Sequence, residues 1–124
     1  MKFYICEHCG NLITFLNNAG VPEMCCGQEM TELIPGSVDA ATEKHVPVVT
    51  RDGNTVTAKV GSVTHPMLDA HYIQWIAMET NQGSQIKYLK PDTAPEVTFA
   101  LAEGEEAIAV YEYCNLHGLW KTEL

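Results

Sequence analysis

The chain has 124 residues, 46% of them hydrophobic, and carries a formal charge of −9 with a pI near 4.8. This length allows one main domain with a hydrophobic core and a small appendage. The acidic balance leaves no basic surface for phosphates, so we expect neither nucleic acid nor anionic membrane as a partner. The sequence shows no leader pattern and no apolar run long enough to span a bilayer, which predicts a cytoplasmic protein.

The first 36 residues are loop-rich and too short to form a core alone, so a metal ion is the expected staple. Four of the five cysteines lie here, unlike the spread cysteines of a disulfide scaffold. Cys6-x-x-Cys9 places two thiolates on one tight turn, where backbone amides donate to sulfur, and Cys25-Cys26 adds two more. The four form a closed sulfur set for Zn²⁺ or a single iron ion.

Sulfur ligands do not distinguish these two metals, so a structural zinc ribbon remains an alternative. The adjacent pair Cys25-Cys26 argues against it, because common zinc ribbons use C-x-x-C twice and vicinal ligands require a distorted pairing. His8 is a rival ligand, but with four thiolates available we expect it to be an exposed bystander. Pro35-Gly36 and the small polar residues that follow predict a linker over residues 33–44.

Beyond the linker the sequence changes to short, strand-like runs at residues 46–50, 55–63, 71–80, 85–90, 96–102 and 107–113. Turn signals such as Asp52-Gly53-Asn54 and Glu103-Gly104 separate them. This pattern is typical of an antiparallel β-sandwich with little helix. The run from Ala107 to Tyr111 is apolar on both faces, which predicts a strand that is covered on both sides.

A second constellation is scattered through this β-rich part: His45, His65, His71, Cys114 and His117. Each histidine alone is more often structural than a ligand, but every histidine other than His8 lies here, beside the one remaining cysteine. A blue-copper site needs an axial Met shortly downstream, and none follows His117. Zinc prefers four ligands, whereas iron accepts five and leaves a sixth position free. A Cys/His nucleophile pair remains the non-metal alternative.

These motifs carry a family resemblance. The chain resembles desulfoferrodoxin, the two-iron class of superoxide reductase. The resemblance extends across essentially the whole chain and rests on four motifs in this order: C-x-x-C…CC, EKHVP, HPM…HYI and CNLHGLW. The resemblance implies a small rubredoxin- or desulforedoxin-like domain over residues 1–36. It also implies a neelaredoxin-like superoxide reductase domain over residues 37–124, with an immunoglobulin-like antiparallel β-sandwich.

The resemblance implies two iron ions per chain. Centre I is an Fe(Cys)4 site formed by Cys6, Cys9, Cys25 and Cys26, which zinc can occupy in recombinant protein. Centre II has His45, His65, His71 and His117 as equatorial ligands and Cys114 as the axial thiolate. The implied reaction is one-electron reduction of superoxide to hydrogen peroxide, in detoxification under oxidative stress. A homodimer and a rubredoxin-type electron donor are the implied partners.

Two residues beside His45 are candidates for work on the substrate. Superoxide is an anion and the chain is acidic, but ferrous iron with one thiolate is locally positive, and Lys44 would add to that field. We expect Lys44 to steer superoxide and to order the water that supplies protons. Glu43 corresponds to the family residue that ligates ferric iron after product leaves. A solvated loop position is the simpler alternative for both.

Backbone N–H groups of residues 115–117 are expected to donate to the Cys114 sulfur and so adjust the reduction potential of centre II. Two other classes of function stay open at this point. One is an electron-transfer iron protein that binds no substrate. The other is a zinc-ribbon interaction module, for which colourless protein is the expected sign.

Overall fold

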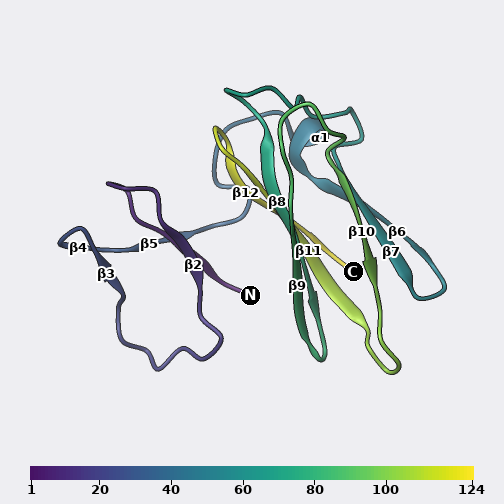
Figure 1. Cartoon of the computed structure of the whole chain (residues 1–124). Helices are drawn as coiled ribbons and strands as arrows, with labels where there is room; N and C mark the ends of the chain where they lie inside the picture. The colour runs from purple at the N-terminus through teal and green to yellow at the C-terminus, as the bar shows by residue number, and fades with distance from the viewer. The chain divides into compact units, whose positions relative to one another are not determined.

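The computed structural model describes all 124 residues, which form two compact units, Met1–Ile34 and Pro35–Leu124 (Figure 1). The first unit holds a three-stranded antiparallel sheet in the order β2-β1-β5 and a two-stranded hairpin, β3-β4. The strands are β1 (Phe3–Ile5), β2 (Leu12–Thr14), β3 (Met24–Cys25), β4 (Gln28–Glu29) and β5 (Thr31–Leu33). Its buried apolar side chains are Phe3, Cys6 and Met30. So small a core agrees with the expectation of a metal staple.

The second unit is a sandwich of two antiparallel sheets, one of three strands in the order β10-β7-β6 and one of four in the order β12-β11-β8-β9. The strands are β6 (Pro47–Asp52), β7 (Thr55–Val60), β8 (Ile73–Thr80), β9 (Gly83–Tyr88), β10 (Glu96–Ala100), β11 (Ala107–Cys114) and β12 (Gly118–Glu123). One helix of four residues, α1 (Thr42–His45), leads into β6. The prediction of a mainly β chain with an immunoglobulin-like sandwich is confirmed.

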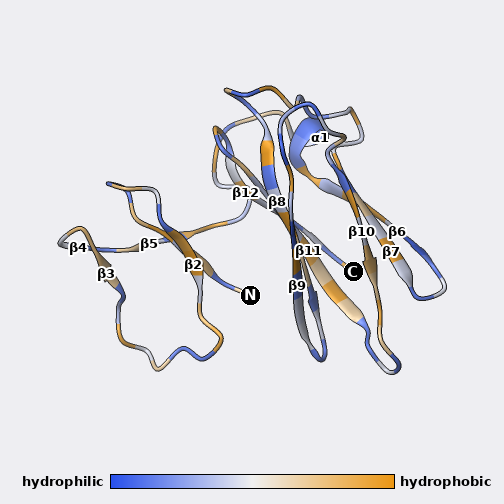
Figure 2. Ribbon diagram, viewed as in Figure 1, coloured by the Kyte–Doolittle hydropathy of each residue, from blue (hydrophilic) through white to orange (hydrophobic).

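The core of this unit lies between the two sheets and follows the strand period of two. In β7 and β10 the inward residues alternate with exposed or half-buried ones: Val56, Ala58, Val60, Val97 and Phe99 are buried. The facing sheet contributes Ile76, Met78 and Val110. Figure 2 shows apolar colour on the paired strands β8 and β11, which lie in the middle of their sheet. Burial of such side chains is the main source of stability here.

The central position of β11 explains why its sequence does not alternate. Residues 109–114 are all buried, so the prediction of a strand covered on both sides holds there. Ile108 is the exception, with 45% of its surface exposed, at a register shift between Ala107 and Ala109. A β-bulge of this kind turns one side chain out of the alternation.

The structure corrects two sequence-based expectations. Strand β12 was not expected, because its outward Lys121 and Glu123 interrupt the apolar pattern, yet it pairs with β11 along its whole length. The expected linker is ordered in part: the Gly36 N–H donates to the Leu119 carbonyl at 2.8 Å, and the segment ends inside α1. The structure contains no helix long enough to cross a membrane.

Candidate metal centres

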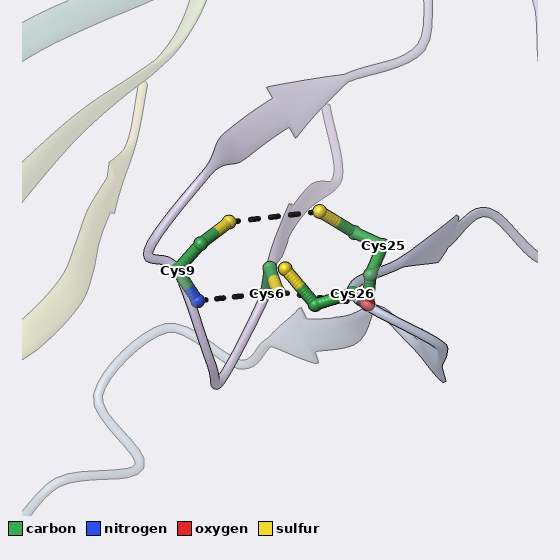
Figure 3. A group of neighbouring side chains, drawn as sticks. All are labelled: Cys6, Cys9, Cys25 and Cys26. Carbon is green, nitrogen blue, oxygen red and sulfur yellow. Dashed lines mark hydrogen bonds between the residues drawn. The ribbon is translucent and has the colours of Figure 1, made fainter.

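The four N-terminal cysteines converge on one point (Figure 3). Their sulfur atoms all lie within 4.8 Å of one another, and the Cys9 and Cys25 sulfurs are 3.6 Å apart. Four thiolates bound tetrahedrally at about 2.3 Å from one metal ion lie roughly 3.8 Å apart. The spacing of the cluster therefore suits a four-coordinate metal. Cys6 is buried, whereas Cys9 and Cys26 are exposed, and His8 is exposed and outside the set.

Local backbone geometry brings these cysteines together. The loop that carries Cys6 and Cys9 is closed by a hydrogen bond from the Gly10 N–H to the Cys6 carbonyl at 2.9 Å, and the Cys9 N–H points at the Cys6 sulfur at 3.5 Å. Cys26 has φ = +52°, an uncommon conformation for a residue with a side chain. This turn lets both members of the vicinal pair face the same point. It is the distortion that the adjacent cysteines were expected to require.

The thiol pKa values in this cluster diverge. Hydrogen bonds, led by that from the Cys9 amide, lower the pKa of Cys6 to about 6. Hydrogen bonds to the neighbouring thiols Cys9 and Cys6 raise the pKa of Cys26 to about 12. The Cys6 thiolate is thus favoured at neutral pH, whereas the Cys26 thiol keeps its proton. Binding a metal cation would release that proton.

The five residues of the second constellation lie at one end of the sandwich. His45 ends α1 just before β6, and His65 follows the turn after β7. His71 precedes β8, and Cys114 ends β11. His117 is in the loop that joins β11 to β12. The antiparallel registers require this arrangement, because they pair Pro47 with Val60 and pair Cys114 with both Ile73 and Gly118.

The donor atoms of this set face one another. One atom from each of His45, His65, His71 and Cys114 lies within 4.8 Å of the others. His117 joins them through Nδ1, which is 3.1 Å from His45 Nε2 and 3.9 Å from the Cys114 sulfur. Two nitrogens bound about 2.1 Å from one metal at right angles lie about 3 Å apart. The His45–His117 separation matches that value.

Hydrogen bonds to backbone carbonyls orient two of the imidazoles. His45 Nδ1–H donates to the Ala41 carbonyl at 2.7 Å, and His65 Nδ1–H donates to the Pro66 carbonyl at 2.6 Å. A carbonyl only accepts, so each proton is on Nδ1 and each Nε2 presents a lone pair. The Nε2 atoms of His65 and His71 are buried without a hydrogen-bond partner. Buried polar atoms are normally satisfied, and a cation would satisfy these two, so the donor set fits a metal.

The environment favours the neutral form of His45, His65 and His71, which is the form that binds metal ions. Burial lowers the pKa of His65 to about 4. Burial is also the main cause that lowers the pKa values of His45 and His71, and the positive charge of Lys44 lowers both further. The Lys44 charge therefore acts on the imidazoles of His45 and His71. Lys44 and Glu43 are both exposed on α1.

Cys114 is fully buried, and burial raises the pKa of its thiol. The backbone N–H groups of Leu116 and His117 oppose this and lower that pKa by hydrogen bonding to the sulfur. Asn115 does not act in the same way, because its N–H donates to the Tyr72 carbonyl at 3.2 Å. The expectation of sulfur-directed amides over residues 115–117 therefore holds for two of the three.

Two further residues belong to this site, Trp120, which was expected to pack here, and Glu112, which was not expected. Trp120 stacks on the His45 ring with centroids 5.0 Å apart, and its Nε1–H donates to the His117 carbonyl at 3.0 Å. Glu112 is fully buried two residues before Cys114, and neither of its carboxylate oxygens has a hydrogen-bond partner. Burial raises the pKa of Glu112 well above its usual range. The strand period of two was the signal for Glu112, since it places this residue on the same face as Cys114.

Known proteins have sequences similar to most or all of this chain. The family model for desulfoferrodoxin matches residues 37–123. A desulfoferrodoxin from Desulfarculus baarsii is 45% identical over 124 residues, which cover 99% of this chain and 96% of that protein. A protein from Pyrococcus horikoshii named superoxide reductase is 31% identical over 105 residues, covering 71% of this chain and 91% of that one.

Solved structures agree. The crystal structure of the superoxide reductase from Treponema pallidum superposes with a TM-score of 0.82 and 42% identity, covering 98% of each chain. The one-iron superoxide reductase from Giardia intestinalis covers 66% of this chain and 99% of its own, with a TM-score of 0.56 and 33% identity. The similarity to the first structure spans both compact units. By its sequence and its fold, this chain belongs to the desulfoferrodoxin family.

Proposed function

We propose that this chain is a superoxide reductase, which transfers one electron to superoxide and, with two protons, yields hydrogen peroxide. The observation that carries the proposal is the donor set at the end of the sandwich, where four imidazoles and one thiolate converge and two buried Nε2 atoms lack partners. Relatives and structural neighbours named superoxide reductase support it.

We assign His45, His65, His71, His117 and Cys114 as the ligands of an iron ion, centre II, and Cys6, Cys9, Cys25 and Cys26 as the ligands of a second, centre I. Five donors suit iron better than four-coordinate zinc, and they leave one position for a substrate. The closed sulfur set of centre I suits iron or zinc equally, and the family membership favours iron. Iron at centre II would supply one electron to superoxide at its open position.

The protein's own groups attract the substrate and prepare the site for it. Superoxide must approach a chain with a charge of −9, and the exposed Lys44 ammonium provides an attractive field beside His45. The same ammonium orders a water molecule from which the product takes its protons. The Glu43 carboxylate, which precedes Lys44 on α1, would be available to bind the oxidised iron after product leaves.

Cys114 and the residues around it set how readily the electron leaves. A thiolate ligand donates electron density to the metal, and the amides of Leu116 and His117 moderate this by binding the sulfur. The carbonyls of Ala41 and Pro66 hold two imidazoles in place from behind. Together these contacts preorganise the donor set, so little rearrangement accompanies the change of oxidation state.

Four further assignments belong to the same proposal. Residues 1–36 act as a separate centre I domain and residues 37–124 as the catalytic one. An external one-electron carrier of the rubredoxin type restores the reduced centre II. The chain works as a homodimer. It acts in the cytoplasm, where reducing conditions keep its five free cysteines available.

The decisive experiment is stoichiometric. The pre-reduced protein is mixed with superoxide, and peroxide is counted. A reductase forms one peroxide for each superoxide consumed, whereas dismutation forms one for every two. An electron carrier without substrate binding would consume no superoxide at a catalytic rate and would show no azide or cyanide binding at centre II. Protein that purifies colourless with only zinc would instead indicate the interaction module.

A further inference from the structure

We propose that the turn of residues 61–64, which begins at Gly61, is a positioning clamp that holds the Glu43–His45 segment over centre II. The clamp rests on the proposed function, because its purpose is to fix Lys44 and Glu43 where superoxide arrives. The turn is a separate part of the chain from α1 and contributes no side chain to the donor set.

The strand pairing brings the two segments together. In the β6–β7 hairpin, Pro47 is opposite Val60, so the residues before β6 and after β7 emerge side by side. Residues 43–45 precede β6, and residues 61–65 follow β7, at the same end of the hairpin. Each segment carries a centre II histidine: His45 two positions before Pro47, and His65 at the end of the turn.

The turn binds α1 through one carbonyl. The Glu43 carbonyl oxygen accepts from the Val63 N–H at 2.9 Å and from the Ser62 hydroxyl at 3.3 Å. The turn is itself closed by the His65 N–H, which donates to the Val60 carbonyl at 3.3 Å. The backbone at Glu43 is thus tied to the same turn that presents His65.

Gly61 allows this close approach. Its φ is +85°, a conformation that residues with side chains rarely adopt. A Cβ at this position would be 2.8 Å from the Glu43 carbonyl oxygen and 2.9 Å from the Lys44 Cα, and it would also collide with the Val63 carbonyl. All three obstacles are backbone atoms, which cannot rotate away. A side chain at residue 61 would therefore force the turn itself to rearrange and would push α1 away from it.

A displacement of α1 would move Lys44 and Glu43, the residues proposed to act on the substrate. Lys44 and Glu43 have exposed side chains, so no core packing restores their positions once the backbone contact is lost. His45 is also held from outside α1, because its ring stacks on Trp120 of β12. The clamp consequently affects substrate attraction and proton supply more than it affects metal binding.

The test compares Gly61→Ala with a matched control, Gly53→Ala. Gly53 lies at the opposite end of the same hairpin and also has a positive φ, of +57°, but a methyl group added there would have no atom within 4 Å. Both variants place a methyl group on a residue with positive φ, but only the one at residue 61 would touch α1. The full-length iron-loaded proteins are compared by iron content, by the rate with superoxide at several salt concentrations and by hydrogen exchange of the segment containing Val63.

We expect Gly61→Ala to retain iron at centre II but to react about 10- to 100-fold more slowly, as small misplacements near a site do. Its rate should lose its salt dependence, and the Val63 segment should lose exchange protection. Gly53→Ala should match the wild type in all three. In the Lys44→Ile background, Gly61→Ala should cost little more, because the misplaced group is already gone. The proposal would be overturned if the rate losses of Lys44→Ile and Gly61→Ala multiplied in the double variant. It would also be overturned if Gly61→Ala and Gly53→Ala slowed the reaction equally.

If Gly61→Ala loses the iron of centre II, the Ser62→Ala variant tests the clamp instead. It removes one hydrogen bond to the Glu43 carbonyl without adding bulk, and a two- to tenfold slower rate is expected, roughly the worth of one hydrogen bond. An unchanged rate and unchanged salt dependence in this variant would contradict the proposal. Hydrogen exchange at Val63 reports the clamp without any activity, so wild-type protein that is protected there but inert toward superoxide would refute the function and not the contact.

Discussion

His45 Nε2 and His117 Nδ1 face each other at 3.1 Å although the two residues are 72 positions apart. One approaches from α1 before the first strand of the sandwich, and the other from the loop before the last. Different ring nitrogens are used because His45 donates its Nδ1 proton to the Ala41 carbonyl, whereas His117 presents Nδ1 directly. The pair thus joins donors from near the beginning and near the end of the second compact unit.

Replacing Cys114 by Ser tests its assignment as the axial ligand. Serine is a poor replacement for a thiolate, so we expect the thiolate-to-iron absorption of centre II to disappear while the centre I bands remain. Metal content per chain and the visible spectrum are measured side by side with the wild type. Retention of both sets of bands would remove Cys114 from the ligand set and return Cys114-x-x-His117 to the core.

Replacing Lys44 by Ile tests electrostatic steering. Loss of a positive charge beside the site should slow the reaction with superoxide by about tenfold and flatten its dependence on ionic strength. Arg51→Gln is the control, since it removes one exposed positive charge at the far end of β6. If both variants slow the reaction equally, net charge rather than the position of Lys44 is responsible.

Replacing Cys9 by Ser separates the two centres. Cys9 is exposed and belongs to the first compact unit, so centre II should keep its iron and its spectrum. We expect the rate with superoxide to stay within about a factor of two, as for independent sites. The first unit, with its three buried apolar side chains, should become sensitive to proteolysis. A large loss of superoxide reduction would instead make centre I part of turnover.

Burial of His65 predicts a pH dependence for the metal-free protein. The pKa of His65 is about 4 in the folded chain and 6.5 in an unperturbed one. Between these values the unfolded state binds a proton that the folded state does not, so the free energy of unfolding decreases as pH falls from 6.5 toward 4. Urea unfolding across this window should show that slope. His65→Gln should have a shallower one, and an identical slope would exclude His65 as its source.

The sequence predicted the chemistry better than the path of the chain. All nine cysteine and histidine residues assigned to metal fall in the two clusters that the structure brings together, because soft or imidazole donors at these spacings have few other uses. The β-sandwich was also predictable, since turn signals separate the apolar runs. Strand β12 was missed, because a short run with Lys121 and Glu123 has no pattern until β11 is beside it.

By itself, then, the sequence determined the ligand types, the division into a cysteine-rich segment and a β-rich segment, and the family resemblance. The tertiary structure decided that His45 and His65 turn Nε2 toward the other donor atoms, because their Nδ1 atoms bond to the carbonyls of Ala41 and Pro66. It also decided that Glu112 lies fully buried on the same strand as Cys114 and that Gly61 touches the backbone of α1. Such contacts depend on how strands pair across long separations, and residue spacing carries no record of that pairing.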